Sequence, residues 1–404
     1  MSAEGLKSSS SWKGFAPAFI VVFNSLAWYT LTYLMFNNAI TQLTISANES
    51  LMLFVAYYVA AALSVIFGSI FFARARDAGL LLWMLAGTVM TVLLTTIMSD
   101  NMSINMLISF LFGISVGVGF PSCLAYFADA TRIEHRGIQG GITWTAIGIG
   151  SLVLALLVTS FDSFSTFAAL AIWRLSGLVA FFFLRNRKGE KETGKSPAYR
   201  SILRRRDVLL YLVPWIMFCF VNFTETPILQ KLFGDFYVLV TLAEFALIGI
   251  FSLIGGLLAD TVGRKRVVIT GFVTLGIAYA LLSFASGTPI SWYLYTAFDG
   301  FAWGMFAAVF FMTLWGDLGE GYEKEKYYAL GGLPYLLAGF LPIVVAPYVD
   351  LIGTVAAFSL ASFFLFLAVL PLMYAPETLP EKSIKERELK SYVEKAKKAK
   401  EKFT

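Results

Sequence analysis

The sequence has few of the residues from which soluble and metal-binding proteins build their surfaces and sites. Only 14% of its 404 residues are charged, whereas soluble domains average about 25%. It contains two cysteines, Cys123 and Cys219, and one histidine, His135. These are too few for a haem, iron–sulfur or zinc site, and no nucleophile–base pair is visible. We therefore expect no cofactor, no metal and no enzymatic activity.

Hydrophobic residues are abundant. They make up 58% of the chain, the mean hydropathy is +0.74, and there are 38 phenylalanines. One water-soluble core cannot bury so much apolar surface. The composition excludes a soluble enzyme, and it also excludes a nucleic-acid binder despite a pI near 9.0. It indicates an integral membrane protein.

Twelve apolar runs are long enough to cross a bilayer, which takes about 20 residues of helix. We expect the helices of the first half at 15–36, 50–73, 78–98, 103–128, 138–160 and 164–184. Those of the second half are expected at 208–228, 236–258, 266–287, 291–316, 328–349 and 354–375. The predicted fold class is an all-α membrane protein, with twelve transmembrane helices in two pseudo-symmetric six-helix bundles.

The polar segments divide the chain into a cytoplasmic tail (1–14), a first half (15–184), a linker (185–207), a second half (208–375) and a charged tail (376–404). All 31 basic residues except Arg174 and Lys231 fall on one side of this topology. Because basic loops face the cytoplasm, both termini are expected there, in a multi-pass protein of the plasma membrane. The basic pI reflects this topology, and the basic ends of the linker suit anionic lipid headgroups.

An internal repeat supports the two halves. Gly113 and Gly117 recur at an offset of 187 residues as Gly300 and Gly304. Small residues at this spacing allow close helix contact. Gly68 and Arg76 recur at an offset of 188 as Gly256 and Arg264. Repeated halves with a binding site between them are typical of transporters.

One segment identifies a family. Gly256-Leu-Leu-Ala-Asp260-Thr-Val-Gly263-Arg264-Lys265-Arg266 resembles the G-x-x-x-D-[RK]-x-G-[RK]-[RK] signature of the major facilitator superfamily. Gly256 permits close helix contact, and Gly263 permits a positive φ in the turn. The resemblance implies that Asp260 holds the two halves together on the inner side when the protein opens outward. Asp260 is expected to act through the N-terminal dipole of the eleventh helix or through an arginine.

The first-half copy of this signature is degraded. The segment is Gly68-Ser-Ile-Phe-Phe-Ala-Arg74-Ala-Arg76, with Phe72 at the position of the aspartate. Without this aspartate, the first half is not expected to form the same contact between the halves on the inner side. Asp129 and Arg136-Gly137 resemble the acidic-to-Arg-Gly element that follows the fourth helix in this superfamily. Asp317 and Lys324 repeat the same spacing. Pro376-Glu377-Thr378 is similar to an element of sugar porters and organic-ion transporters.

Four ionisable residues fall inside predicted helices, where a central charge costs about 2.5–3.5 kcal/mol and usually serves function. Glu244 and Asp299 lie at similar depth in the second half and are the candidates for proton coupling. Glu225, beside Pro227, is a third. Arg174 is at mid-membrane, where it either grips an anionic group of the substrate or neutralises one of the carboxylates.

Further side chains are candidates for substrate binding. Many proton-coupled sugar porters keep an aspartate in the first helix, where this chain offers Asn24, Asn37 and Asn38 instead. Tryptophans can stack on a sugar or an organic ring, although most such rings serve packing. The predicted substrate-binding set is therefore Arg174, Asn24, Trp28, Trp173 and Trp303.

We expect a secondary active transporter that moves a small polar or anionic organic solute by alternating access. The fifth helix lacks the Gly-Pro pair of drug/proton antiporters, which favours symport or facilitation. A multidrug/proton exporter and a non-transporting receptor of the same fold are the alternatives. The expected partners are the small-molecule substrate, protons and membrane lipids, with no nucleic acid, and the chain is expected to be a monomer.

Overall fold

The computed structural model describes residues 3–96, 101–158, 161–185 and 196–380, and the predicted tail beyond 380 lies outside them. The first half consists of α1 (Ala3–Gln42), α2 (Ala47–Phe71), η1 (Phe72–Ala75), α3 (Arg76–Leu93), η2 (Leu94–Thr96), α4 (Met102–Gly117), α5 (Phe120–Ala130), α6 (Arg136–Val158) and α7 (Ser163–Leu184). The short helix α8 (Tyr199–Ile202) lies in the linker. The second half consists of α9 (Arg206–Phe233), α10 (Phe236–Thr261), α11 (Arg264–Ala285), α12 (Pro289–Phe306), η3 (Ala307–Thr313), α13 (Leu314–Leu318), α14 (Glu325–Ala338), α15 (Leu341–Val345), η4 (Ala346–Leu351) and α16 (Thr354–Tyr374).

The helices of the described residues make the twelve predicted crossings. Eleven runs are long and apolar enough to cross a membrane, and one of them, Ala47–Leu93, has 47 residues. At 1.5 Å per residue this run would measure about 70 Å, more than twice the hydrocarbon thickness. It turns back at Ala75, whose backbone (φ −140°, ψ 55°) breaks the helix, so α2 and α3 are two crossings.

Three crossings predicted as continuous helices are interrupted. The fourth breaks between α4 and α5 at Gly119, where a Cβ would lie 2.1 Å from the Trp83 ring. The tenth runs through α12, η3 and α13, and η3 is a π-helix. Its sequence, Ala307–Thr313, contains neither glycine nor proline, so no sequence signal marks it. The eleventh is broken at Gly339 between α14 and α15.

The repeat predicted from the glycines appears in the packing. α2 packs on α4 in the first half, and α10 packs on α12 in the second. A Cβ on Gly117 would lie 2.2 Å from Oγ of Ser64, and a Cβ on Gly304 would lie 2.5 Å from Cβ of Phe251. Only glycine allows either approach, and the predicted pseudo-symmetric fold is confirmed.

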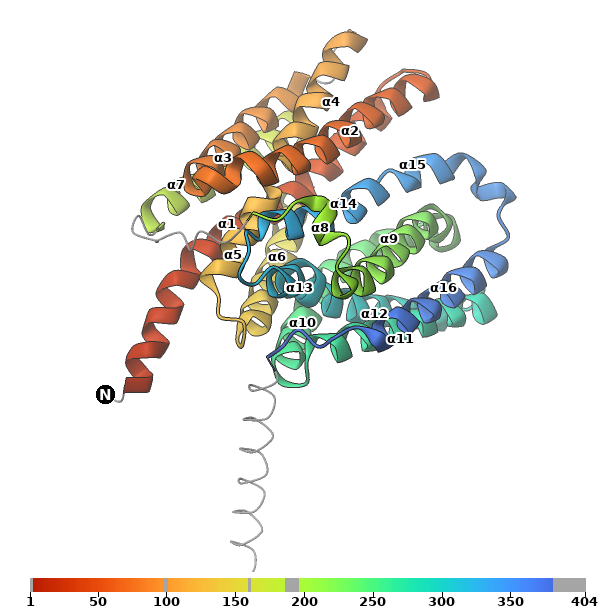
Figure 1. Cartoon of the computed structure of the whole chain (residues 1–404). Helices are drawn as coiled ribbons and strands as arrows, with labels where there is room; N and C mark the ends of the chain where they lie inside the picture. The colour runs from red at the N-terminus through yellow and green to blue at the C-terminus, as the bar shows by residue number, and fades with distance from the viewer. Residues whose placement is uncertain (1–2, 97–100, 159–160, 186–195, 381–404) are drawn as a thin grey trace, which may run out of the picture.

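The two halves meet along two seams. α6 packs against α10, and α14 packs against α2 and α5. Figure 1 shows α1 to α7 forming one group of helices and α9 to α16 another, with α8 between them.

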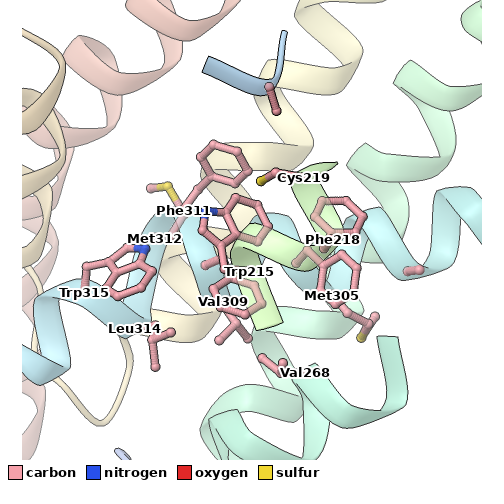
Figure 2. Packing of buried hydrophobic residues seen from close by; sticks show 14 of the residues in the cluster. Trp215, Phe218, Cys219, Val268, Met305, Val309, Phe311, Met312, Leu314 and Trp315 are labelled. Atoms are coloured by element: carbon pink, nitrogen blue, oxygen red, sulfur yellow. The ribbon is translucent and has the colours of Figure 1, made fainter. Parts of the chain in front are cut away.

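Each half also has a packed interior. In the second half the buried Trp215 ring stacks on Phe310, with centroids 4.5 Å apart, and on Phe218 at 5.2 Å. Nε1 of Trp215 donates to the carbonyl of Gly331 at 2.7 Å, which ties α9 to α14. Figure 2 shows Trp215 among Phe311, Val309 and their neighbours. This core packs α9 against the π-helix, to which Phe310 and Phe311 belong.

Candidate functional site

A cavity of about 210 Å³ lies between the two halves. The first half contributes Thr30 from α1 and residues of α6. The second half contributes residues of α9, α10, α12 and α14. The lining residues are Thr30, Trp144, Ile147, Gly148, Ser151, Asn222, Thr226, Leu229, Phe233, Tyr237, Val240, Glu244, Phe245, Ile248, Tyr295, Asp299, Trp303 and Tyr335. Both halves thus surround one space, as a solute site between them requires.

Two carboxyl groups form part of the cavity wall. Glu244 from α10 and Asp299 from α12 both line it, and their side chains interact directly. Asp299 is only 2% exposed, and its Oδ1 has no hydrogen-bond partner among the described residues. No salt bridge involves either residue in the described part of the chain. We call this pair the carboxyl dyad.

Aromatic and amide groups surround the dyad. Nε1 of Trp303 donates to Oδ1 of Asn222 at 3.2 Å, which fixes the amide of Asn222 and leaves its NH2 group for other partners. The Trp303 ring packs edge-on to Tyr335, with centroids 6.1 Å apart. Trp144 of the first half packs on Phe311 of the second half, across the interface between the halves. The wall therefore offers ring faces and hydrogen-bonding groups, but none of its residues is basic.

Arg174 does not lie on this wall. Its guanidinium is enclosed by the rings of Trp28 and Trp83, at 4.5 and 4.4 Å from their centroids. It is fully buried inside the first half, where Nη1 donates to Oγ of Ser25 and to Oδ1 of Asn24. The structure brings Arg174 neither to the carboxyl dyad nor to the cavity.

The other first-half candidates belong to the same interior network. Nδ2 of Asn24 donates to the carbonyl of Trp173 at 2.6 Å, and Nε1 of Trp173 donates to the carbonyl of Asn24 at 3.1 Å. Nε1 of Trp28 donates to Oγ1 of Thr91 at 2.7 Å. These contacts join α1 to α7 and α3. Of the five predicted substrate-binding residues, only Trp303 lines the cavity.

Glu225 is not among the residues that line the cavity. It is 6% exposed, and its Oε2 has no hydrogen-bond partner among the described residues. Its neighbours Asn222 and Thr226 face the cavity instead. Glu225 is therefore not part of the wall that carries the dyad.

Away from the cavity, the halves are joined at the ends that carry the basic loops (72–76, 131–136, 262–266 and 319–326), which we call the basic-loop side. Asp260 at the end of α10 accepts hydrogen bonds from the backbone N–H groups of Gly137 (2.9 Å) and Ile138 (2.8 Å). These two groups are at the N-terminus of α6, whose dipole favours a negative charge. The prediction that Asp260 contacts the N-terminus of the eleventh helix is wrong, because it binds the N-terminus of the fifth crossing, α6. Nη1 of Arg264 also lies 3.2 Å from Oδ1 of Asp260, but Arg264 belongs to the same half, so this pair does not join the halves.

The glycines of the signature serve this contact. A Cβ on Gly256 would lie 2.2 Å from the carbonyl oxygen of Gly137. Gly263 has the predicted positive φ, +105°, which favours glycine. The backbones of α10 and α6 can therefore come close enough for the Asp260 carboxylate to reach the end of α6.

Two acids on this side have equivalent surroundings. Asp317 binds Arg264 of its own half (Nε–Oδ2, 3.0 Å) and Arg136 of the other half. Asp129 binds Arg76 of its own half (2.6 Å) and Lys324 of the other half (2.7 Å). An offset of 188 residues relates Asp129 to Asp317, Arg76 to Arg264 and Arg136 to Lys324. The repeat thus extends to the ion pairs that cross the interface.

The first half has a contact that corresponds to the Asp260 contact, and Glu325 of the second half takes part in it. By the offset of 188, Phe72 corresponds to Asp260, and Glu325 corresponds to Gly137. Oε1 of Glu325 accepts from Nε of Arg76 at 2.7 Å, and the Glu325 side chain is fully buried at the start of α14. A Cβ on Gly137 would lie 2.5 Å from Oδ1 of Asp260, so a side chain at this position points to the carboxylate site. Glu325 therefore supplies, from the other half, the carboxylate that Phe72 lacks.

The segment after the last helix stabilises the signature turn. Oε1 of Glu377 accepts from the backbone N–H of Arg264 at 2.8 Å, and Oε2 accepts from that of Lys265 at 3.2 Å. Nζ of Lys265 donates to the carbonyl of Met373 at 2.7 Å. Oγ1 of Thr378 donates to Asp317 at 3.2 Å. Lys265 thus contacts its own half.

Sequence reasoning missed several residues of both sites. Thr30, Asn222, Tyr237, Tyr295 and Tyr335 line the cavity, but they are ordinary residues of apolar helices and carry no signal. Glu325 could have been found, because the offset of 188 places it opposite the missing aspartate.

The comparisons with known proteins agree with this geometry. The Major Facilitator Superfamily model matches residues 18–239 and 226–401. The crystal structure of the human organic anion transporter MFSD10 superposes with a TM-score of 0.65 at 18% identity, over 90% of this chain and 99% of that chain. The E. coli fucose:proton symporter FucP gives 0.72 at 11% identity, over 90% and 98%. The proton:xylose symporter XylE gives 0.67 at 15% identity, over 92% and 97%. No curated protein sequence matches the chain.

Proposed function

The chain belongs to the major facilitator superfamily, and on this premise we propose that it is a proton-coupled secondary transporter of a small polar organic solute. The solute binds in the cavity between the halves, and the carboxyl dyad carries the proton. The protein works as a monomer in the plasma membrane, in contact with its lipids, with the basic-loop side in the cytoplasm.

The position of the carboxyl dyad is the observation that supports this proposal most strongly. Two interacting carboxyl groups on a cavity wall without basic residues have a high free energy when both are negatively charged, because like charges repel strongly in a site of low dielectric. A proton on the dyad relieves this repulsion. Since the dyad lies on the wall of the cavity that binds the solute, protonation of the dyad and binding of the solute affect each other.

The contacts on the basic-loop side support alternating access. Both signature turns and both acid–base networks hold the halves together there, on one side of the cavity. Release of these contacts would open the cavity toward that side. With that side in the cytoplasm, as the basic loops indicate, the structure represents a state closed to the cytoplasm.

The size and charge of the cavity narrow the substrate. Sites for drug-sized ligands measure about 300–1,000 Å³, and this cavity measures about 210 Å³. A small solute therefore fits better than the substrates of a multidrug exporter. The acidic wall disfavours the anionic solute considered from the sequence, since Arg174 lies elsewhere.

Transport in proteoliposomes tests the proposal. A thermal-shift screen of small polar compounds against the purified full chain first supplies a solute. Glu244→Gln and Asp299→Asn should each abolish accumulation driven by a proton gradient but preserve exchange of labelled for unlabelled solute, because exchange needs no net change of protonation. Glu225→Gln is the matched control, since it removes a buried carboxyl of the same half outside the cavity, and it should accumulate normally.

Two results would contradict the proposal. Gradient-driven accumulation that survives in the Glu244→Gln/Asp299→Asn double variant would exclude the dyad as the coupling site. Solute binding without any flux in either direction would favour a receptor of this fold.

A further inference from the structure

The cavity wall has a single sign of charge. Glu244 and Asp299 are acidic, and every other lining residue is neutral. The buried guanidinium of Arg174 is enclosed by Trp28 and Trp83 and faces the first-half interior. A carboxylate or phosphate on an entering solute would meet two acidic groups and no basic partner. The wall is thus built to attract a cation.

An incomplete hydrogen-bond shell points in the same direction. Oδ1 of Asp299 is buried and has no partner among the described residues. Leaving a buried polar atom unsatisfied costs about 1–3 kcal/mol, and more for a charged one. Because Asp299 lines the cavity, whatever enters the cavity can complete this shell. A proton, a hydrogen-bond donor or a cationic group does so, whereas an anion without a donor does not.

Aromatic rings provide a second, independent preference. Trp144 from the first half and Trp303, Tyr237, Tyr295 and Tyr335 from the second line the same cavity as the dyad. The face of such a ring attracts an ammonium group by about 0.5–2 kcal/mol, and cages of several rings bind quaternary ammonium ions. Rings on both sides of the interface and carboxyl groups on one side together match a cation with a small apolar shell.

We propose that the substrate is a small organic cation of the ammonium class, which takes the place of a proton on the Glu244–Asp299 pair, so that the transporter exchanges protons for this cation. This inference rests on the proposed function. Exchange follows because both positive charges need the same two carboxyl groups, so binding of one expels the other. It replaces the symport expected from the sequence of the fifth helix.

Binding of choline to the purified full chain is the first test. Choline and tetramethylammonium are the cationic probes, and dimethylbutanol, which has carbon in place of the choline nitrogen, is the uncharged control of the same shape. Fluorescence of Trp144 and Trp303 reports occupancy, with Trp144→Phe and Trp303→Phe identifying their signals. We expect at least tenfold tighter binding of choline than of dimethylbutanol, weaker binding at lower pH, and release of one proton per bound choline into weakly buffered solution.

Uptake of radiolabelled choline into proteoliposomes tests the direction of coupling. Choline has a permanent charge, so a pH gradient cannot trap it passively as it traps a weak base. Exchange predicts accumulation when the lumen is more acidic than the medium, because protons leave as choline enters. Symport predicts accumulation when the lumen is more alkaline. Asp299→Asn should remove proton release and gradient-driven uptake, and Glu225→Gln should keep both.

The outcomes separate this inference from the proposed function. Accumulation of a neutral solute from the thermal-shift screen with an alkaline lumen, lost in Asp299→Asn, would overturn the cation inference and leave the proposed function standing. Equal affinity for choline and dimethylbutanol, or no binding of either cation, would also overturn it. Choline exchange that persists in the double dyad variant would overturn both.

Discussion

The two contacts that close the basic-loop side are equivalent in position but differ in where their carboxylate comes from. In the second-half contact, Asp260 at the end of α10 reaches across to the backbone of Gly137 and Ile138. In the first-half contact, Phe72 replaces the aspartate, and Glu325 at the start of α14 reaches back to Arg76. The two halves therefore both place a carboxylate at this contact, but they take it from different residues.

Helix dipoles explain why this exchange is tolerated. The N-terminus of α6 and the N-terminus of α14 both favour a negative charge nearby. Asp260 approaches its helix end from another helix, whereas Glu325 is part of the helix whose end it stabilises. Glu325 then needs a basic partner to join the halves, and Arg76 serves as this partner.

The contacts also differ in their exposure to solvent. The side chains of Arg264, Asp317 and Arg136 are at most 2% exposed, and that of Asp260 is 5% exposed. In the first-half contact Arg76 is 18% exposed and Asp129 is 42% exposed. Water screens the first-half charges more strongly. We therefore expect the second-half contact to contribute more to closure.

Removing the charge of Asp260 should have the largest effect on closure. Asp260→Asn keeps the shape but weakens two hydrogen bonds that a charge strengthens, and such bonds contribute about 1.5–3 kcal/mol. The closed state should lose about 2 kcal/mol, or roughly thirtyfold in population ratio. Modification of single cysteines introduced along the cavity by a membrane-impermeant reagent should shift toward the inner side, with impaired transport and normal expression. Asp207→Asn is the control, since Asp207 pairs with Arg205 of its own half.

Neutralising Glu325 should have a smaller effect in the same direction. Glu325→Gln keeps the size of the side chain and weakens the pair with the partly exposed Arg76. Because Arg76 is partly exposed and keeps Asp129 as a partner, we expect a loss of about 1 kcal/mol, or several-fold in population ratio. The same cysteine modification measures it. Glu323→Gln, two residues earlier, removes an acid that forms no ion pair in the described residues. An effect of Glu325→Gln larger than that of Asp260→Asn would reverse our ranking of the two contacts.

Moving the carboxylate back should sharpen the comparison further. Phe72→Asp combined with Glu325→Gly recreates in the first half the residue pair of the second half. If the charge at the site matters and its origin does not, the double variant should recover part of the closure that Glu325→Gly loses. We expect incomplete recovery, because Phe72 also packs against Gly79. A double variant as open as Glu325→Gly alone would show that the halves are not interchangeable.

The smallest effect on closure is expected from Glu377. In the described residues, the hydrogen bonds of Glu377 lie within the second half, where it caps α11 at Arg264 and Lys265. Loss of such a cap costs about 0.5–2 kcal/mol. Glu377→Gln should lower the melting temperature but leave the cysteine modification pattern near that of the unmodified chain. A pattern as shifted as that of Asp260→Asn would mean that the tail segment takes part in closure.

The sequence predicted the fold because membrane topology depends on features it shows directly. Long apolar runs, the sign of the loop charges and the glycine repeat gave the twelve crossings and the two halves. The signature turn was also visible, since Gly256, Asp260 and Gly263 are close in sequence. The π-helix at Ala307–Thr313 was not, because this segment contains neither glycine nor proline and reads as ordinary apolar helix.

The site was predicted less well, for a physical reason. Buried charges mark important positions, but they do not say which way a side chain points. Glu244, Asp299 and Arg174 gave the same signal, yet the first two line the cavity and the third is enclosed by tryptophans. The partner of Asp260 was assigned to the eleventh helix and lies on the fifth crossing, because sequence spacing does not reveal which helices of the two halves meet.

A distance measurement across the basic-loop side tests the account most directly. His135 in the first half and Tyr322 in the second are exposed, and both native cysteines are buried, so His135→Cys/Tyr322→Cys can carry two spin labels. Pulsed electron paramagnetic resonance of the labelled chain in lipid should give mainly one short distance. Adding Asp260→Asn should produce a longer distance as the main population, and Asp207→Asn should not. An unchanged distribution in the Asp260→Asn protein would contradict the claim that this carboxylate holds the two halves together.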